Sequence, residues 1–104
     1  MFGEIFLCQF PFTSGLISKI RPALVLFDLK DDVIICRITS AARSGGALDV
    51  VISDWRKSGL LKPSVARLDR IVTAERTVLL RELGKLTAKD LEAVRSQWNQ
   101  HMRL

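Results

Sequence analysis

Short apolar runs separated by polar or glycine-containing turns make up most of the chain. Isoleucine, valine, phenylalanine and leucine are frequent in these runs, which is typical of strands in a small, partly buried sheet. The segments that we predict as strands are residues 4–10, 22–29, 32–39, 48–53, 64–68, 71–73 and 77–83. Only Lys30 and Asp31 separate the second run from the third. We therefore expect a tight antiparallel hairpin, in which the outer ends of the two strands, at Arg21 and Thr39, meet.

Two segments predict helix instead of strand. Residues 53–58, followed by Gly59, have the composition of one or two helical turns with an N-cap and a glycine after the last turn. Near the end of the chain Thr87 is a candidate N-cap, and Asp90 stands three residues later, in the position of a capping box. The residues that then recur at helical spacing are Leu91, Val94, Trp98 and Met102. We expect this stripe to pack a helix over about residues 88–102 onto the sheet rather than to form a groove for a partner.

These elements predict a mainly β protein with a small α content. The 104 residues suffice for one domain, residues 1–104, and a composition of 48% hydrophobic and 26% charged residues argues against disorder. Several short strands point to a strongly curved antiparallel sheet or partial barrel over about residues 3–84, closed on one side by the terminal helix. No secretory signal is visible, nor a run of the roughly 20 apolar residues that a membrane span requires. We expect a cytoplasmic protein without a membrane partner.

Residue counts exclude several kinds of site. His101 is the only histidine, so no site within one chain can use two imidazoles. Cys8 and Cys36 lie in apolar runs without a CxxC motif, and we expect two buried free thiols rather than a zinc site. Glycine-rich nucleotide-binding motifs and clustered metal-binding carboxylates are also absent from the sequence. We therefore expect neither a metal ion nor another cofactor.

The net charge and the loop lengths say less about possible binding partners. The net charge is +5, and the whole basic excess lies after residue 42. This balance is compatible with a polyanionic partner but does not require one. Two polar, glycine-bearing loops, residues 11–21 and 40–47, are long for so small a protein, and such loops often carry function.

Arginine, hydroxyl and carboxylate groups remain as candidates for chemistry. Pro22 holds Arg21 extended at the entrance of its strand, beside the predicted end of the next strand at Thr39. A guanidinium beside a hydroxyl suits a phosphodiester, because the planar fork binds two oxygens and the hydroxyl adds a donor. Arg67 and Asp69 share one face of a strand by alternation. Simpler explanations stay open: a solvated cation at Arg21, a hydroxyl that caps its own backbone at Thr39, and a surface ion pair between Arg67 and Asp69.

Six short motifs follow one another along the chain: GEIFL at residues 3–7, FPF at 10–12, SKIRPALV at 18–25, ITS at 38–40, GLLKPS at 59–64 and LGKL at 83–86. In this order they resemble the PemK/MazF family of toxins from type II toxin–antitoxin systems. The resemblance extends over roughly residues 3–95 and depends on the whole set, since each motif alone is weak. It implies an SH3-like partial β-barrel with short helices and a homodimer. It also implies an endoribonuclease that cleaves single-stranded RNA, such as mRNA, at short sequence motifs and is neutralised by a cognate antitoxin that covers the RNA groove.

The same resemblance implies roles for individual residues. The arginine and threonine that carry catalysis in the family match Arg21 and Thr39, and an R-x-D element that some members use matches Arg67 and Asp69. The implied reaction is a metal-independent transesterification. In it Arg21 stabilises phosphoryl charge, Thr39 hydrogen-bonds the phosphate, Asp69 is the candidate base and Arg67 binds phosphate beside it. The loop histidine of other members has no counterpart here. The implied RNA-binding residues of the two loops are Ser18, Lys19, Ser40 and Arg43.

Two other function classes remain open on the sequence alone. A non-catalytic barrel of this kind would inhibit a protein target such as DNA gyrase, as CcdB-type toxins do on a similar fold, or would bind RNA or a peptide without cleaving it. A gyrase inhibitor would not need the Arg21–Thr39 pair. Incubation of the purified protein with a long single-stranded RNA separates these classes from a nuclease.

Overall fold

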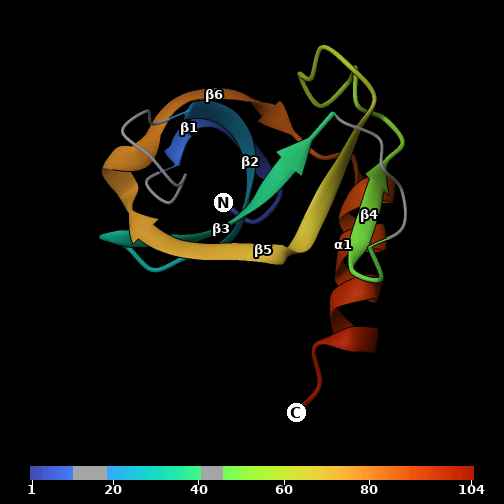
Figure 1. Cartoon of the computed structure of the whole chain (residues 1–104). Coiled ribbons are helices and arrows are strands. Elements are labelled where there is room, and N and C mark those ends of the chain that lie inside the picture. The colour runs from blue at the N-terminus through green and yellow to red at the C-terminus, as the bar shows by residue number, and fades with distance from the viewer. Residues whose placement is uncertain (11–18, 41–45) are drawn as a thin grey trace.

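The computed structural model describes residues 1–10, 19–40 and 46–104. Within these ranges the chain forms strands, one 3₁₀ turn and one α-helix (Figure 1). The strands are β1 (Glu4–Phe10), β2 (Lys19–Asp28), β3 (Asp32–Thr39), β4 (Asp49–Ile52), β5 (Ser64–Glu75) and β6 (Leu79–Lys85). The turn η1 (Arg76–Val78) joins β5 to β6, and the helix α1 (Ala88–His101) follows β6. The predicted mainly β fold with a C-terminal helix is confirmed. No helix in the described ranges is long and apolar enough to cross a membrane.

The strands form one antiparallel sheet in the order β4-β5-β3-β2-β1-β6. In Figure 1 the ribbons of β6, β1, β2, β3 and the later part of β5 curve around a common centre, and η1 carries the chain from β5 across to β6. Strand β4 lies outside this ring, beside α1, and pairs with the first residues of β5. The result is the strongly curved, partly open barrel that the short strands predicted.

Strand β5 is longer than either of the two strands predicted for this part of the chain. Its pairing with β3 changes register, because Cys36 lies opposite Ile71 whereas Arg37 lies opposite Arg67. Residues 68–70 therefore have no partner in β3, and β5 bends there from the ring towards β4 (Figure 1). The break predicted from the sequence is thus a bulge within one continuous strand.

Two apolar clusters pack against opposite faces of the sheet, because successive side chains of a strand point to opposite sides. The first cluster lies against α1 and contains Leu24, Ile38 and the helix residue Val94. Leu91, Trp98 and Met102 pack against the same cluster, so the predicted helical stripe is confirmed. The buried residues of the second cluster are Cys8, Phe10, Ala23, Val25, Val33 and Ile35.

Both cysteines are buried free thiols, as predicted. Cys8 belongs to the second cluster and Cys36 to the first. Burial raises the pKa of each thiol to about 12. Neither is therefore a reactive thiolate at neutral pH in the folded protein.

The start of α1 differs from the prediction. Thr87 is the N-cap residue, but its hydroxyl donates to Asp54 Oδ2 (2.8 Å) and not to the carboxylate or an amide of its own helix. The carboxylate of Asp90, only 1% exposed, accepts the backbone N–H groups of Ser53 (3.0 Å) and Asp54 (2.8 Å). The predicted capping box is wrong, because both side chains bind the chain between β4 and β5 instead.

This β4–β5 connection, residues 53–63, starts with one helical turn, as expected: the Ser58 N–H donates to the carbonyl of Asp54 (3.1 Å), and the turn ends at Gly59 without continuing into a longer helix. Gly59 has a φ of +87°, the conformation expected of a glycine that ends a turn. A Cβ atom at Gly59 would overlap the carbonyl oxygen of Leu83, and a Cβ at Gly84 would overlap that of Ser58. The connection is therefore held against α1 at its start and against the backbone of β6 near Gly59.

Candidate functional site

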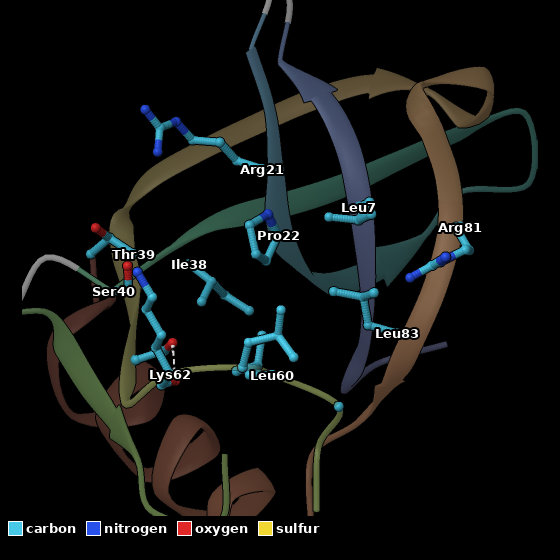
Figure 2. A pocket seen from close by; sticks show the side chains of 13 residues that line it. Leu7, Arg21, Pro22, Ile38, Thr39, Ser40, Leu60, Lys62, Arg81 and Leu83 are labelled. Atoms are coloured by element: carbon cyan, nitrogen blue, oxygen red, sulfur yellow. Dashed lines mark hydrogen bonds between the residues drawn. The ribbon is translucent and has the colours of Figure 1, made fainter. Parts of the chain in front are cut away.

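A cavity of about 340 Å³ opens where β2 begins and β3 ends (Figure 2). Its apolar side chains come from strands β1, β2, β3 and β6 and from the β4–β5 connection. They are Leu7, Pro22, Ile38, Leu60, Leu61 and Leu83. Its polar side chains are Arg21, Thr39, Ser40, Lys62, Ser64 and Arg81. The cavity, called the reaction cavity below, thus combines an apolar floor with a cationic rim.

Arg21 and Thr39 reach this cavity from neighbouring strands. Ala23 lies opposite Arg37 in the β2–β3 pair, and the two antiparallel strands continue from there towards Arg21 and Thr39. Figure 2 shows both side chains on the same side of the cavity and Arg81, from β6, on the other. The predicted meeting of the two strand ends is confirmed.

A second cavity, of about 280 Å³, lies on the other side of Arg21. We call it the arginine cavity. Its polar lining is formed by Arg21, Arg37, Asp69 and Arg70, and its apolar lining by Phe10, Ile71 and Val72. Arg21 lines both cavities, so it lies between Thr39 in the reaction cavity and Asp69 in the arginine cavity.

Arg67 and Asp69 are neighbours, but Arg67 also has a structural partner. Its Nε atom lies 3.9 Å from Asp69 Oδ1 and 3.5 Å from Asp49 Oδ1. Asp49 stands directly opposite Arg67 in the β4–β5 pair and its side chain is 8% exposed, whereas that of Asp69 is 41% exposed. Arg67 therefore links β4 to the bulged part of β5, while Asp69 is accessible from the arginine cavity.

The four predicted RNA-binding residues are placed unevenly. Ser40 is exposed and lines the reaction cavity. Lys19 is exposed at the start of β2, two residues before Arg21. Ser18 and Arg43 lie outside the described residues.

Sequence reasoning missed four cations of these cavities: Arg37, Lys62, Arg70 and Arg81. A signal was present for Arg37, which interrupts the apolar run of β3 two residues before Thr39 and so points to the same face. Arg70 is brought in by the bulge of β5, which the sequence does not specify. Lys62 and Arg81 come from segments far apart in the chain.

Several arginines at and beside the second cavity have buried N–H groups without hydrogen bonds. The Nε–H groups of Arg21, Arg37 and Arg67 are buried and donate to no acceptor among the described residues. Burial, together with the positive charges of Arg21, Arg67 and Arg70, lowers the pKa of the Arg37 guanidinium. Like charges so arranged favour an anion between them. Among the described residues, no group of three or more His, Cys, Asp or Glu side chains is placed to hold a metal ion.

Comparison with known proteins identifies one family. Residues 1–102 match the family model of PemK-like, MazF-like toxins of type II toxin–antitoxin systems. No curated protein sequence matches the chain.

Several solved structures have a similar fold. The Mycobacterium tuberculosis toxin MazF-mt6 is 26% identical over 93% of both chains, with a TM-score of 0.76. An endoribonuclease in complex with its cognate antitoxin, from a mycobacterial species, is 17% identical over 96% of this chain and 91% of that chain, with a TM-score of 0.76. MazF in a MazE–MazF complex from Deinococcus radiodurans is 22% identical over 99% of this chain and 93% of that chain, with a TM-score of 0.68. At these two lower identities the likeness is one of fold alone.

Proposed function

The chain belongs to the family of PemK-like, MazF-like toxins of type II toxin–antitoxin systems, and from this premise we propose that it is an endoribonuclease. Its substrate is single-stranded RNA, including mRNA, which it cleaves at short sequence motifs. The observation that carries the proposal is the position of Arg21 between two cavities, with Thr39 on one and Asp69 on the other. A phosphodiester that contacts Arg21 is then within reach of a hydroxyl donor and of a carboxylate.

The proposed reaction is a transesterification within the RNA. A ribose 2′-hydroxyl loses its proton and its oxygen bonds to the adjacent phosphorus. The bond from phosphorus to the 5′-oxygen of the next nucleotide breaks, and that oxygen takes up a proton. The products are a 2′,3′-cyclic phosphate and a 5′-hydroxyl. DNA is not a substrate, because it lacks the 2′-hydroxyl.

This reaction needs stabilisation of the phosphoryl charge, a base for the 2′-hydroxyl and a proton for the leaving oxygen. Arg21 supplies the first requirement with its planar guanidinium, which matches two phosphoryl oxygens. Thr39, on the same cavity, hydrogen-bonds the phosphate and fixes its orientation. The side chains thus act on the phosphate from neighbouring strands.

Asp69 is the proposed base. Its carboxylate is accessible and shares the arginine cavity with Arg21. Arg67 lies 3.9 Å from it, and so can hold the carboxylate in place while adding positive charge beside the phosphate. Because Arg67 also pairs with Asp49, its substitution affects β4 as well as the site.

We also propose the assembly and location of the protein. It acts in the cytoplasm as a homodimer, and a cognate antitoxin inhibits it by covering the RNA groove. The structurally similar proteins that are described in complex with antitoxins support this partner. The RNA contacts outside the reacting centre come from Ser18, Lys19, Ser40 and Arg43.

The test is to incubate the purified protein with a long single-stranded RNA in the presence of EDTA and to map the 5′ ends of the fragments. We expect cuts at one short motif, with 5′-hydroxyl and cyclic phosphate ends. A DNA strand of the same sequence is the matched control and stays intact. Intact RNA would contradict the proposal and favour a gyrase inhibitor or a binding module. Loss of cleavage in EDTA would contradict the metal-independent reaction.

A further inference from the structure

Three adjacent strands bring arginines to one face of the sheet. Arg37 in β3 lies opposite Ala23 in β2 and opposite Arg67 in β5. Arg21 stands two residues before Ala23 and therefore points to the same side. Arg70 joins the three from the bulge of β5, as a lining residue of the arginine cavity. These four arginines continue the face that carries the second apolar cluster.

The positive charge of this group is not balanced by the protein. Its two nearby carboxylates, Asp49 and Asp69, both lie beside Arg67. No ion pair to a described carboxylate is formed by Arg21, Arg37 or Arg70. Arg21 and Arg37 are partly buried whereas Arg70 is exposed, and partly buried unpaired charges cost stability unless an anion neutralises them. The buried Nε–H groups of Arg21 and Arg37, which donate no hydrogen bond to the described residues, are donors that an anion bound between them would satisfy.

The position of the group relative to the reaction cavity identifies the anion. Arg21 belongs to both cavities, so the arginine cavity begins where the reaction cavity ends. The unpaired guanidinium groups of the arginine cavity are neutralised by a phosphate and not by an uncharged nucleobase, whereas the reaction cavity has apolar side chains that a base can contact. An RNA strand that crosses Arg21 therefore places a phosphate, rather than a base, against Arg37 and Arg70.

We propose that Arg37 and Arg70, together with Arg21, bind the phosphate adjacent to the scissile one, so that the RNA backbone passes from the reaction cavity into the arginine cavity across Arg21. This inference rests on the proposed function, since it assumes RNA in the reaction cavity. It adds Arg37 and Arg70 as residues that bind the substrate without taking part in the bond changes. Asp69, on the same cavity, repels a phosphate and keeps it on the side of Arg37 and Arg70.

The test measures binding of a single-stranded RNA that is 2′-O-methylated throughout and cannot be cleaved. The dissociation constant is determined at several chloride concentrations for the wild type, Arg37→Gln and Arg70→Gln. Each lost phosphate contact lowers the slope of log K against log salt by about 0.7 for a single strand. We expect this decrease together with about tenfold weaker binding at low salt, as for a lost charge-assisted hydrogen bond.

Lys89→Gln is the charge-matched control, because Lys89 is exposed on α1 and lines neither cavity. It should leave the slope unchanged. Arg37→Lys keeps the charge and serves as the conservative variant in case Arg37→Gln does not fold. It should retain the slope but bind RNA more weakly, because lysine lacks the planar fork of arginine. Equal slopes for Arg37→Gln, Arg70→Gln and Lys89→Gln would overturn the inference.

Inorganic phosphate distinguishes a free anion from the RNA backbone. At constant ionic strength, replacing chloride by phosphate should raise the Tm of the wild type and of Lys89→Gln more than that of Arg37→Gln, because the general stabilisation by excluded phosphate is common to all three proteins. A Tm effect of phosphate without any change of the RNA slopes would assign the site to a free anion and overturn the RNA contact. Failure of the proposed function gives a different result: Arg37-dependent binding without cleavage of unmodified RNA refutes the nuclease and leaves only a phosphate contact of an RNA-binding module.

Discussion

Arg21 is the residue at which the two cavities meet, and its position follows from local backbone chemistry. Pro22 restricts Arg21 to an extended conformation. Strand β1 pairs with it on one side, where Cys8 lies opposite Arg21, and β3 ends beside it on the other. A side chain at the rim of two cavities can contact an extended ligand that occupies both, which a residue at the bottom of one pocket cannot do.

Substitution of Arg21 by alanine should lower kcat for RNA cleavage by at least a factor of about 100, the usual loss when one preorganised donor to a developing charge is removed. Thr39→Val, which removes only a hydroxyl, should cost about tenfold or more. Thr73→Val is the matched control, because Thr73 is an exposed residue of β5, and this variant should cleave RNA normally. Single-turnover cleavage of a short RNA measures all three, and full activity of folded Arg21→Ala protein would refute the assigned role.

The same residues show how far the sequence alone leads. Arg21 and Thr39 could be predicted to meet, because a short turn joins the two strands that carry them. The exact register could not, since an irregularity between Val25 and Phe27 shifts it by one residue. Arg37 had a signal as a charge within the apolar run of β3, but its neighbours Arg67 and Arg70 could not be predicted, since they come from β5, which is distant in the chain. Asp69 and Arg70 depend on a bulge, for which β propensities contain no signal.

At the scale of elements, the β4–β5 connection forms one wall of the reaction cavity through Leu60 and Lys62. It contains little regular structure of its own, so neighbouring elements hold it. The carboxylate of Asp90 and the hydroxyl of Thr87 bind its first residues, and backbone contact at Gly59 holds its centre against β6. The sequence showed Thr87 and Asp90 as a local helix cap, because a pattern within one helix cannot reveal a partner 36 residues away.

Asp90→Ala should lower the free energy of unfolding by about 2–4 kcal/mol, because two buried N–H groups lose a charged acceptor. Urea denaturation measures this loss. In the folded variant the cavity wall is less well held, so KM for RNA should rise more than kcat falls. Glu92→Ala removes an exposed carboxylate of the same helix, paired only with Arg95, and should change stability by less than about 0.5 kcal/mol. Equal effects of the two substitutions would argue against the role of Asp90 in holding the β4–β5 connection.

At the scale of the whole molecule, the distribution of charge matters more than its sum. Residues 1–42 have no net charge, yet they supply Arg21 and Arg37 to the most positive part of the surface described above. Residues 43–104 supply Lys62, Arg67, Arg70 and Arg81 to the same region. Folding thus concentrates a charge that the composition shows only as a mild excess.

Cleavage at subsaturating RNA should therefore depend steeply on salt. With three phosphate contacts, kcat/KM should fall about twentyfold between about 50 and 200 mM chloride. At saturating RNA, kcat should change much less. The phosphate contacts that salt weakens are made both in the enzyme–RNA complex and in the transition state, so their loss does not change the barrier between the two. Initial rates at both RNA concentrations measure this difference. A kcat/KM independent of salt would contradict electrostatic binding of the backbone.

Each apolar cluster contains one buried thiol, whose reactivity reports when that cluster opens. With a pKa of about 12 for both, alkylation near pH 8 proceeds only through conformations that expose the sulfur. Cys8 lies opposite Arg21, in the cluster beneath the arginines, and Cys36 lies in the cluster beneath α1. Uncleavable RNA should slow the alkylation of Cys8 more than that of Cys36, as followed by mass spectrometry of the two peptides. The unmodified protein thus carries its own pair of probes for timing local unfolding on either face of the sheet.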